Sequence, residues 1–397
     1  EIRLSLVGSE MCIRDRYQHH SFNNKEVEVQ IASFSNGNEV SEYHIILQGT
    51  QPTLTYKEQL NNLTDVYNSL LTGELKGASA LFKRYFLSDA ANQGEMLLAM
   101  ATEYSDCALS IVEQPPLNGT KIALWVYLQT DVQSRVLPNG LFEAVHGNYR
   151  HFWGGSAFNR AANSEYQTRL LLNDYVMQLM EQGCTLADHC IRTWFFVQNV
   201  DVNYAGVVKA RNEVFVTQNL TEHTHYIAST GIGGRHADPK VTVQMDTYAV
   251  DGISAAQVQY LYAPTHLNPT YEYGVSFERG TCVKYGDRRQ VFISGTASIN
   301  NKGEVVHPGD IRLQTHRMWE NVEVLLQEAE CTFDDLAQMI VYLRDTADYQ
   351  IVKQLFDERF PQIPKVILLA PVCRPGWLIE MECIATKADR NEAFANY

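Results

Sequence analysis

The stretch QTRLLLNDYVMQLMEQGCTLAD at residues 167–188 aligns without a gap with QTHRMWENVEVLLQEAECTFDD at residues 314–335. Gln-Thr opens both segments, and Cys-Thr recurs near the end of both at the same spacing. In the later segment, apolar residues return every three or four positions, which indicates an amphipathic helix. These matches indicate an internal repeat, and this repeat decides the fold.

A fainter copy of the helix, EQLNNLTDVYNSLL, occupies residues 58–71. Each copy is followed by an apolar closing strand, at residues 122–128, 241–250 and 377–386. We therefore predict an α+β protein built from three tandem units, with the helices packed on one face of each sheet. Turn-rich connectors place the units at residues 17–130, 131–265 and 266–397.

Three repeated units in one chain predict a ring with approximate threefold symmetry that closes within a monomer. The opening, EIRLSLVGSEMCIRDR at residues 1–16, fits none of the repeats. We interpret it as a sequencing artefact and leave it out of the fold.

Composition limits the classes of function that the chain can have. The chain has 397 residues, of which 45% are hydrophobic, yet no apolar run approaches the roughly 20 residues that span a bilayer. A net charge of −14 argues against a nucleic-acid partner. The eight cysteines show no CxxC spacing, which is typical of a cytoplasmic protein. The glycines of STGIGG lack the spacing of a phosphate or dinucleotide loop, and we expect no cofactor and no metal.

The closing strand of the third unit carries an unusual acid. Glu380 lies in the apolar strand WLIEMECIAT, whereas the second unit has Gln244 at this position and the first has apolar residues around Ala123. A structural requirement would have kept the charge in all three copies. Burial disfavours the ionised form of a carboxyl group, so Glu380 is a candidate proton donor near neutral pH.

A second charge is also restricted to the third unit. Arg344 ends the strand VYLR, and we align it with Val197 in the second unit and Ser88 in the first. Planar guanidinium groups match carboxylates, so Arg344 is a candidate for binding an anionic substrate. Arg279 is another, because it precedes Gly280, which permits a ligand to approach the backbone closely.

The segment from VFISGTASI at 291–299 to the closing strand resembles the YjgF/RidA superfamily, whose fold is also described as chorismate-mutase-like. The arrangement of three such units resembles the chorismatases. The matching segments are STGIGGR at 229–235, FERG at 277–280, VYLR at 341–344, and Cys373 followed by Glu380. The resemblance implies an active site between the central and third units, where chorismate is cleaved to pyruvate and a ring acid.

The resemblance also assigns roles to residues of this chain. It implies that Glu380 is the proton donor and that Cys373 takes part in catalysis. The residues expected to bind substrate are Arg344, Arg279, Gly280, Tyr342, Thr230 and Gly231. The weaker cation candidates are Arg235, Arg374 and Lys365.

The product is predicted from two small residues. Gly280 paired with Cys373 resembles the chorismatases that release 3-hydroxybenzoate, whereas alanine at both positions resembles those that release a dihydroxycyclohexadiene acid. An imine or enamine deaminase is an alternative, although deaminases of the superfamily carry an arginine after the proline where this chain reads IPKVILL, with Lys365. A binding protein without catalytic activity is the other alternative.

Overall fold

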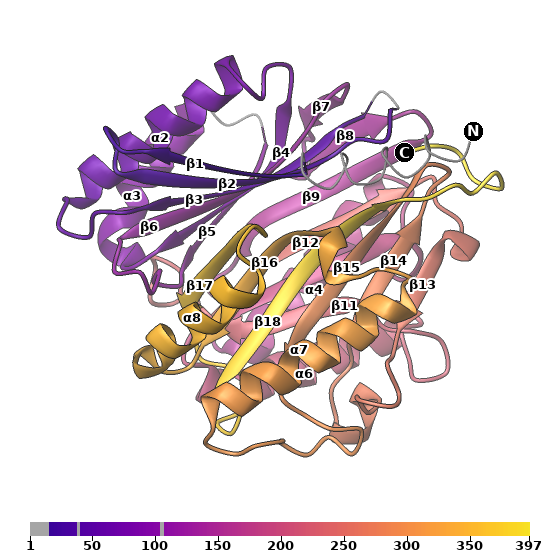
Figure 1. Ribbon diagram of the computed structural model, residues 1–397. Coiled ribbons are helices and arrows are strands. Elements are labelled where there is room, and N and C mark those ends of the chain that lie inside the picture. Colours follow the sequence, from indigo (N-terminus) through magenta and orange to yellow (C-terminus); the bar gives the residue numbers. More distant parts are fainter. Residues whose placement is uncertain (1–15, 38–39, 104–106) are drawn as a thin grey trace, which may run out of the picture.

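Three six-stranded sheets form the protein in a computed structural model that describes residues 16–37, 40–103 and 107–397 (Figure 1). Each sheet runs through its strands in the same order, with the first three strands in sequence, then the sixth, the fourth and the fifth. In each sheet the fourth and fifth strands are parallel. The α+β plan of three tandem units is therefore confirmed.

The first sheet has the order β1-β2-β3-β6-β4-β5. Its strands are β1 (Tyr17–Phe22), β2 (Val27–Phe34), β3 (Glu42–Gly49), β4 (Ser79–Leu87), β5 (Ala108–Glu113) and β6 (Ile122–Gln129). Helices α2 (Tyr56–Thr72) and α3 (Ala90–Glu103) accompany it. Thr55 caps α2, because its side chain accepts from Glu58 N while the Glu58 carboxylate accepts from Thr55 N.

The second sheet has the order β11-β10-β12-β9-β8-β7, and the third has β13-β14-β15-β18-β16-β17. The strands of the second are β7 (Gln133–Val136), β8 (Phe142–His146), β9 (Tyr149–Phe158), β10 (Cys190–Val197), β11 (Ala228–Gly233) and β12 (Val243–Asp251). Those of the third are β13 (Val258–Leu261), β14 (Gly280–Lys284), β15 (Arg288–Ala297), β16 (Leu336–Leu343), β17 (Lys365–Leu369) and β18 (Ile379–Ala388). The helices are α4 (Ser164–Glu181), α5 (Leu186–His189) and α6 (Val200–Thr217), then α7 (Ile311–Glu328) and α8 (Tyr349–Arg359).

A β-bulge recurs at one place in all three sheets. The register of the closing strand against its neighbour shifts at residues 80–82, 190–192 and 336–338. With this register, Ala123, Gln244 and Glu380 occupy equivalent positions, opposite Phe86, Phe196 and Tyr342. The predicted equivalence of Glu380 and Gln244 is thus confirmed.

The same register corrects the alignment of Arg344. Leu343 pairs with Ile379, and Val197 pairs with Val243, so these two residues are equivalent. The residue equivalent to Arg344 is therefore Gln198, one position beyond the predicted Val197. The repeat in the amino-acid letters does not reveal this one-residue slip.

The inner faces of the three sheets share one hydrophobic core, and the helices lie outside them (Figure 1). Phe82 of the first sheet packs against Trp194 of the second, with ring centroids 6.3 Å apart. Tyr248 of the second packs against Phe292 of the third at 5.3 Å. Burial of such large rings is the main favourable term in joining the units.

Buried ion pairs also cross between units. Arg84 on β4 binds Asp246 on β12, with Nη2 2.8 Å from Oδ2. Arg192 on β10 binds Glu382 on β18, with Nη2 3.0 Å from Oε2. All four side chains are almost completely buried, so removing one partner would leave a charge without compensation.

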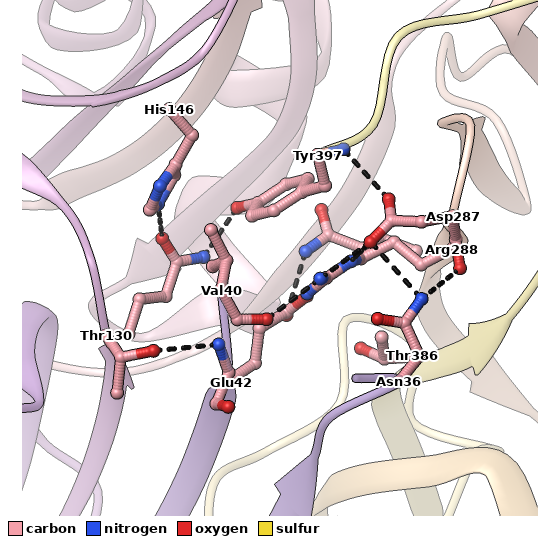
Figure 2. Close-up of polar contacts among 12 residues, drawn as sticks. Asn36, Val40, Glu42, Thr130, His146, Asp287, Arg288, Thr386 and Tyr397 are labelled. Carbon is pink, nitrogen blue, oxygen red and sulfur yellow. Dashed lines mark hydrogen bonds and ion pairs between the residues drawn. The ribbon is translucent and has the colours of Figure 1, made fainter. Parts of the chain in front are cut away.

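A polar cluster joins the first and third units elsewhere in the core (Figure 2). Arg288 Nη1 donates to Glu42 Oε1 at 2.7 Å, and its Nη2 donates to Asp287 Oδ2 at 2.9 Å. The backbone nitrogen of Tyr397 donates to Asp287 Oδ1 at 2.8 Å. The Tyr397 ring lies 5.3 Å from that of His146 of the second unit, so all three units meet here.

The predicted unit boundaries need one correction. Strand β13 pairs with β14 in the third sheet, although residues 258–261 fall before the predicted boundary at 265/266. Residues 1–15 of the segment interpreted as an artefact lie outside the described residues. Arg16 is described, and its guanidinium donates to the carbonyl oxygens of Asp335 at 2.6 Å and Thr386 at 2.7 Å. None of the described helices has the length and apolar character to cross a membrane.

Candidate active site

A small cavity lies between the second and third units. Helix α6 and strand β11 form one wall, and β15, β18 and the segments before β14 and β18 form the other. The lining residues are Tyr204, Arg211, Ser229, Thr230, Gly231, Tyr273, Val275, Phe277, Arg279, Gly295, Ala297, Ile299, Cys373, Arg374, Trp377 and Glu380. Its volume is about 30 Å³, below the roughly 300–1,000 Å³ of ligand pockets. A ligand therefore enters only if the side chains at its mouth move.

Glu380 projects into this cavity from β18. It pairs with Ala297 on β15 and Tyr342 on β16, and it is 4% exposed. Gly295 lies in a bulge of β15, where a Cβ atom would come within 2.1 Å of Glu380 Oε1. The carboxyl group thus needs a glycine beside it, which the sequence analysis missed.

Burial raises the pKa of the Glu380 carboxyl to about 8. The nearby charge of Glu382 adds to the rise, while Arg192 and Arg279 oppose it. None of the described residues hydrogen-bonds to the Glu380 carboxyl. The group can therefore hold a proton at neutral pH and deliver it to a ligand in the cavity.

Glu382 lies two residues further along the same strand and has a different environment. Its Oε1 accepts from Trp194 Nε1 at 2.8 Å, and its Oε2 accepts from Arg192 Nη2 at 3.0 Å. It is 2% exposed, so it is a buried member of an ion pair between the second and third units. These contacts fix the Glu382 side chain behind the cavity, two residues along the strand from Glu380.

Two buried arginines line the cavity. Arg279 is 4% exposed, donates from Nη2 to Asn268 O at 3.0 Å, and has no hydrogen-bond partner at Nε. Arg211 on α6 is 1% exposed, and neither its Nε nor its Nη2 has a partner. A buried guanidinium without partners is costly unless a ligand supplies an anion. Arg279 was predicted from the sequence, and Arg211 was not.

Thr230 also faces the cavity, as predicted. Its Oγ1 accepts from Arg192 Nη2 at 2.6 Å and from Gly295 N at 2.9 Å. A hydroxyl oxygen has two acceptor positions and one proton, so this proton remains available for a ligand. Gly231 follows, and a Cβ atom there would lie 2.6 Å from Tyr204 Cε2, so the Tyr204 ring packs directly on the strand backbone.

Cys373 lines the cavity near Tyr204, whose hydroxyl hydrogen-bonds to the thiol. Burial raises the pKa of the Cys373 thiol to about 12, and the neighbouring Glu380 adds to the rise. The thiol is therefore neutral at physiological pH. It can make a weak polar contact, but it cannot act as an anionic nucleophile or base.

Three predicted site residues do not line the cavity. Arg344 binds Asp201 at the start of α6 and donates to Val372 O at 2.6 Å, so it holds the segment beside Cys373 in place. Tyr342 is completely buried inside β16, and its hydroxyl has no partner. Gly280 lies within the third sheet, where a Cβ atom would lie 3.0 Å from Leu261 Cδ1 and 3.1 Å from Ile293 Cδ1.

Of the three weaker cation candidates, one lines the cavity and two do not. Arg374 does line the cavity and is exposed at its mouth, 5.1 Å above the Tyr273 ring and 5.5 Å above the Trp377 ring. Arg235 pairs with Glu113 at 3.1 Å, and Lys365 lies at another unit interface. Arg374 is thus the group that can move to admit a ligand.

One group of possible metal ligands exists among the described residues. Cys184, His189 and Asp251 offer ligand atoms within 4.8 Å of one another. However, Arg150 already donates to Asp251 Oδ2 from Nε at 2.9 Å and from Nη2 at 2.6 Å. A guanidinium against one ligand opposes a cation there, and the group lies outside the cavity.

The fold and the interface cavity define a class of protein built from three repeated α+β units. Residues 281–387 match the family described as Endoribonuclease L-PSP. A RutC family protein of Pyrococcus abyssi is 35% identical over 100 residues, which are 24% of this chain and 78% of the relative. The 3-aminoacrylate deaminase RutC of Acinetobacter baylyi is 30% identical over 97 residues, 24% of this chain and 77% of the enzyme. The chain belongs to this RutC and RidA family.

The whole three-unit arrangement also has a counterpart among solved structures. A chorismatase crystal structure matches 77% of this chain and 93% of its own, with a TM-score of 0.61 and 17% sequence identity. At this identity the match shows a shared fold. It extends the likeness from the third unit to most of the chain.

Proposed function

We propose that the protein is a chorismatase that cleaves chorismate to pyruvate and a ring acid. The observation that carries this proposal is the placement of Glu380 beside Arg211 and Arg279 in one buried cavity. A carboxyl group with a raised pKa and two buried guanidinium groups suit a dianionic substrate that needs a proton. The fold shared with a chorismatase supports the same conclusion.

The chemistry starts at the enol ether of the substrate. Glu380 protonates the terminal carbon of the enolpyruvyl group, which yields an oxocarbenium ion. Attack by water gives pyruvate and a dihydroxycyclohexadiene acid, with one water consumed. Capture within the substrate followed by aromatisation gives pyruvate and 3-hydroxybenzoate, with no net water consumed.

The substrate carboxylates complement the cations of the cavity. Arg211 and Arg279 have unpaired donors, and each can bind one carboxylate. Thr230 donates its free proton to a substrate oxygen. Arg374, at the mouth, can fold over the bound anion, which would exclude water from the reacting atoms.

We favour 3-hydroxybenzoate as the ring product, because Cys373 lies in the cavity. Gly280 does not contact the cavity directly, so it can act only by letting the sheet pack closely behind Arg279. A neutral thiol offers a small polar contact for the ring during rearrangement. The choice between the two products thus rests on Cys373.

Incubation of the purified protein with chorismate tests the proposal. Pyruvate release is followed with lactate dehydrogenase and NADH, and chromatography of the digest identifies the ring acid. Release of both products at equal amounts would support the proposal. Stable chorismate after prolonged incubation would contradict it.

An imine or enamine deaminase is the second candidate, because the third unit is similar to a 3-aminoacrylate deaminase. Strand β11 of the second unit faces Glu380 and is equivalent to β17, the strand that Lys365 begins. It has Ser229 at the position of Lys365, so neither strand has the arginine of the deaminase pattern. This difference disfavours the deaminase. Ammonia release from 2-iminopropionate, faster than its spontaneous hydrolysis, would reverse the preference, and inactivity toward both substrates would favour a binding protein.

We also propose that the protein acts as a cytoplasmic monomer on a small molecule. Three units in one chain can close the ring that single units close as trimers. None of the seven described cysteines forms a disulfide, as expected in a reducing compartment. Light scattering would give about 45 kDa for a monomer.

A further inference from the structure

Strand β4 of the first unit places a lysine where the other units have uncharged residues. Lys83 pairs with Val126, and the equivalent pairs are Thr193 with Thr247 and Met339 with Cys383. The position faces the helices on the outer side of the sheet. Lys83 is 9% exposed, although lysine is rarely buried without a partner.

Lys83 lines a large cavity between the first sheet and its helices. The volume is about 640 Å³, compared with about 30 Å³ for the interface cavity. The wall consists of side chains from α2, α3, β4, β6 and the β7–β8 hairpin of the second unit. The members used below are Leu60, Leu63, Tyr67, Lys83, Leu97 and Arg135.

The charged side chains described for this wall, Lys83 and Arg135, are both positive. None of the described residues that line the cavity is an aspartate or glutamate, in a chain of net charge −14. Arg135 is exposed and already paired with Glu143 at 2.6 Å. Lys83 Nζ lies 4.7 Å from the centre of the Tyr67 ring, and no described residue hydrogen-bonds or ion-pairs with it. Among the described residues of the wall, Lys83 therefore carries the one charge without a hydrogen bond or an ion pair.

We propose that this cavity binds a small monocarboxylate with an apolar body, such as an aromatic acid. The carboxylate pairs with Lys83 and thereby supplies the missing counter-ion. The apolar body packs against Leu60, Leu63 and Leu97. A single unpaired ammonium group beside apolar side chains suits one carboxylate better than a phosphate, which requires more donors.

The cavity is separate from the interface cavity, with which it shares no lining residue. The inference therefore does not depend on the proposed function. A protein that releases no pyruvate from chorismate can still bind an aromatic acid at Lys83. A protein that releases pyruvate can equally lack a ligand site at Lys83.

Calorimetric titration of the full chain with benzoate tests the inference, with neutral benzamide as the matched control ligand. We expect benzoate to bind with a dissociation constant at or below about 1 mM and benzamide to bind at least tenfold more weakly. Lys83→Met copies the side chain of Met339 in the third unit and should weaken benzoate at least tenfold. Pyruvate release from chorismate should stay within about twofold of the parent protein.

Arg211→Met serves as the opposite control, because the interface cavity also carries cations. It should leave benzoate binding at Lys83 unchanged. Lys83→Gln, which retains a polar end, replaces Lys83→Met if the latter does not fold. Absence of benzoate binding, or equal binding by the parent and both Lys83 variants, would overturn the inference.

Discussion

The interface between the second and third units holds a cavity at Glu380, whereas hydrogen bonds cross the interface between the first and second units at the equivalent position. Gln244 occupies the position of Glu380 there, and its Nε2 donates to Ile111 O at 2.9 Å and to Ser156 Oγ at 3.0 Å. Ser156 in turn occupies the bulge position of Gly295 and accepts from Ile111 N at 2.8 Å. The Gln244 amide and the Ser156 hydroxyl thus connect the second unit to the first. At the equivalent positions of the third unit, Glu380 and Gly295 leave the carboxyl group available for a ligand.

This difference teaches that two side chains decide whether a repeated interface can carry out chemistry. The backbone register is the same at both interfaces, including the bulges. The Gln244 side chain donates a hydrogen bond to Ile111 of the first unit, so it helps to hold the first and second units together. Glu380 has no such partner among the described residues, and the cost of burying it appears as a raised pKa.

The largest expected effect comes from Glu380→Gln, which gives the third unit the amide of the second. Pyruvate release should fall by at least about a hundredfold, because an amide holds no transferable proton. Substrate binding, measured by calorimetry, should change little. Exposed Glu358→Gln is the control. Near-parental turnover by Glu380→Gln would show that another group donates the proton.

Gly295→Ser gives the third unit the bulge residue of the second. The new Cβ would lie 2.1 Å from Glu380 Oε1, so the carboxyl group must move. We expect turnover to fall roughly a hundredfold, because displacement of a catalytic group by about 1 Å has effects of this size. The reciprocal Ser156→Gly should leave turnover within about twofold, since Gln244, which holds no transferable proton, occupies the position of Glu380 there. Equal turnover of the two variants would contradict the comparison.

Arg211→Gln removes an unpaired guanidinium from the cavity wall. We expect kcat/KM for chorismate to fall about 10- to 100-fold, the range for a lost charge-assisted hydrogen bond, mainly through KM. The melting temperature should not fall, because Arg211 makes no hydrogen bond within the described chain. Lys209→Gln, on the exposed side of α6, is the control. A large loss of stability with unchanged KM would mark Arg211 as structural.

The pH dependence follows from the raised pKa of Glu380. Turnover requires the protonated carboxyl, so kcat/KM should be level below about pH 7 and fall about tenfold per pH unit above about 8. The effect on stability has the same direction. Because the pKa of Glu380 in the folded protein lies above its ordinary value of 4.5, the protonated carboxyl contributes fully to the free energy of unfolding below pH 4.5. This contribution is lost as the pH rises through 8. Chemical unfolding of Glu380→Gln should lack that loss. An unchanged profile in the variant would assign the titration to another group.

The smallest expected effect is that of Cys373→Ala on product choice. Total pyruvate should stay within about fivefold of the parent, because the neutral thiol transfers no proton in the first step. The share of 3-hydroxybenzoate should fall and that of the dihydroxycyclohexadiene acid should rise, as measured by chromatography. A parent protein that releases only the dihydroxy acid would refute the predicted product.

The sequence was sufficient for features that follow from the repeat. Three copies of a strand and helix pattern predicted three equivalent sheets, and the single acid among the copies predicted Glu380. The alignment of Arg344 with Val197 was wrong because a one-residue slip between the copies is invisible in letters. Arg344 itself lies just beyond the end of β16, where it binds Asp201 instead of lining the cavity. The bulges that set the register leave no signal in a strand made of apolar residues.

Arg211 and Gly295 were missed for a different reason. Arg211 does leave a signal, since it lies in the buried stripe of α6 with Val207, Val214 and Phe215. An arginine in such a stripe marks a buried charge that needs a partner. The need for Gly295 arises from a contact between neighbouring strands, which local sequence does not describe.

The ion pair between Arg192 and Glu382 has a consequence for the history of the chain. Glu382 takes its cations from other units, with Arg192 at 3.0 Å and Arg84 at 3.8 Å. The third unit has Gln338 and Ile340 at the positions equivalent to these arginines. Three copies of the third unit would gather three buried carboxylates with no cation to balance them. Although this unit carries the match to the single-unit relatives, its closing strand depends on cations that the other two units supply.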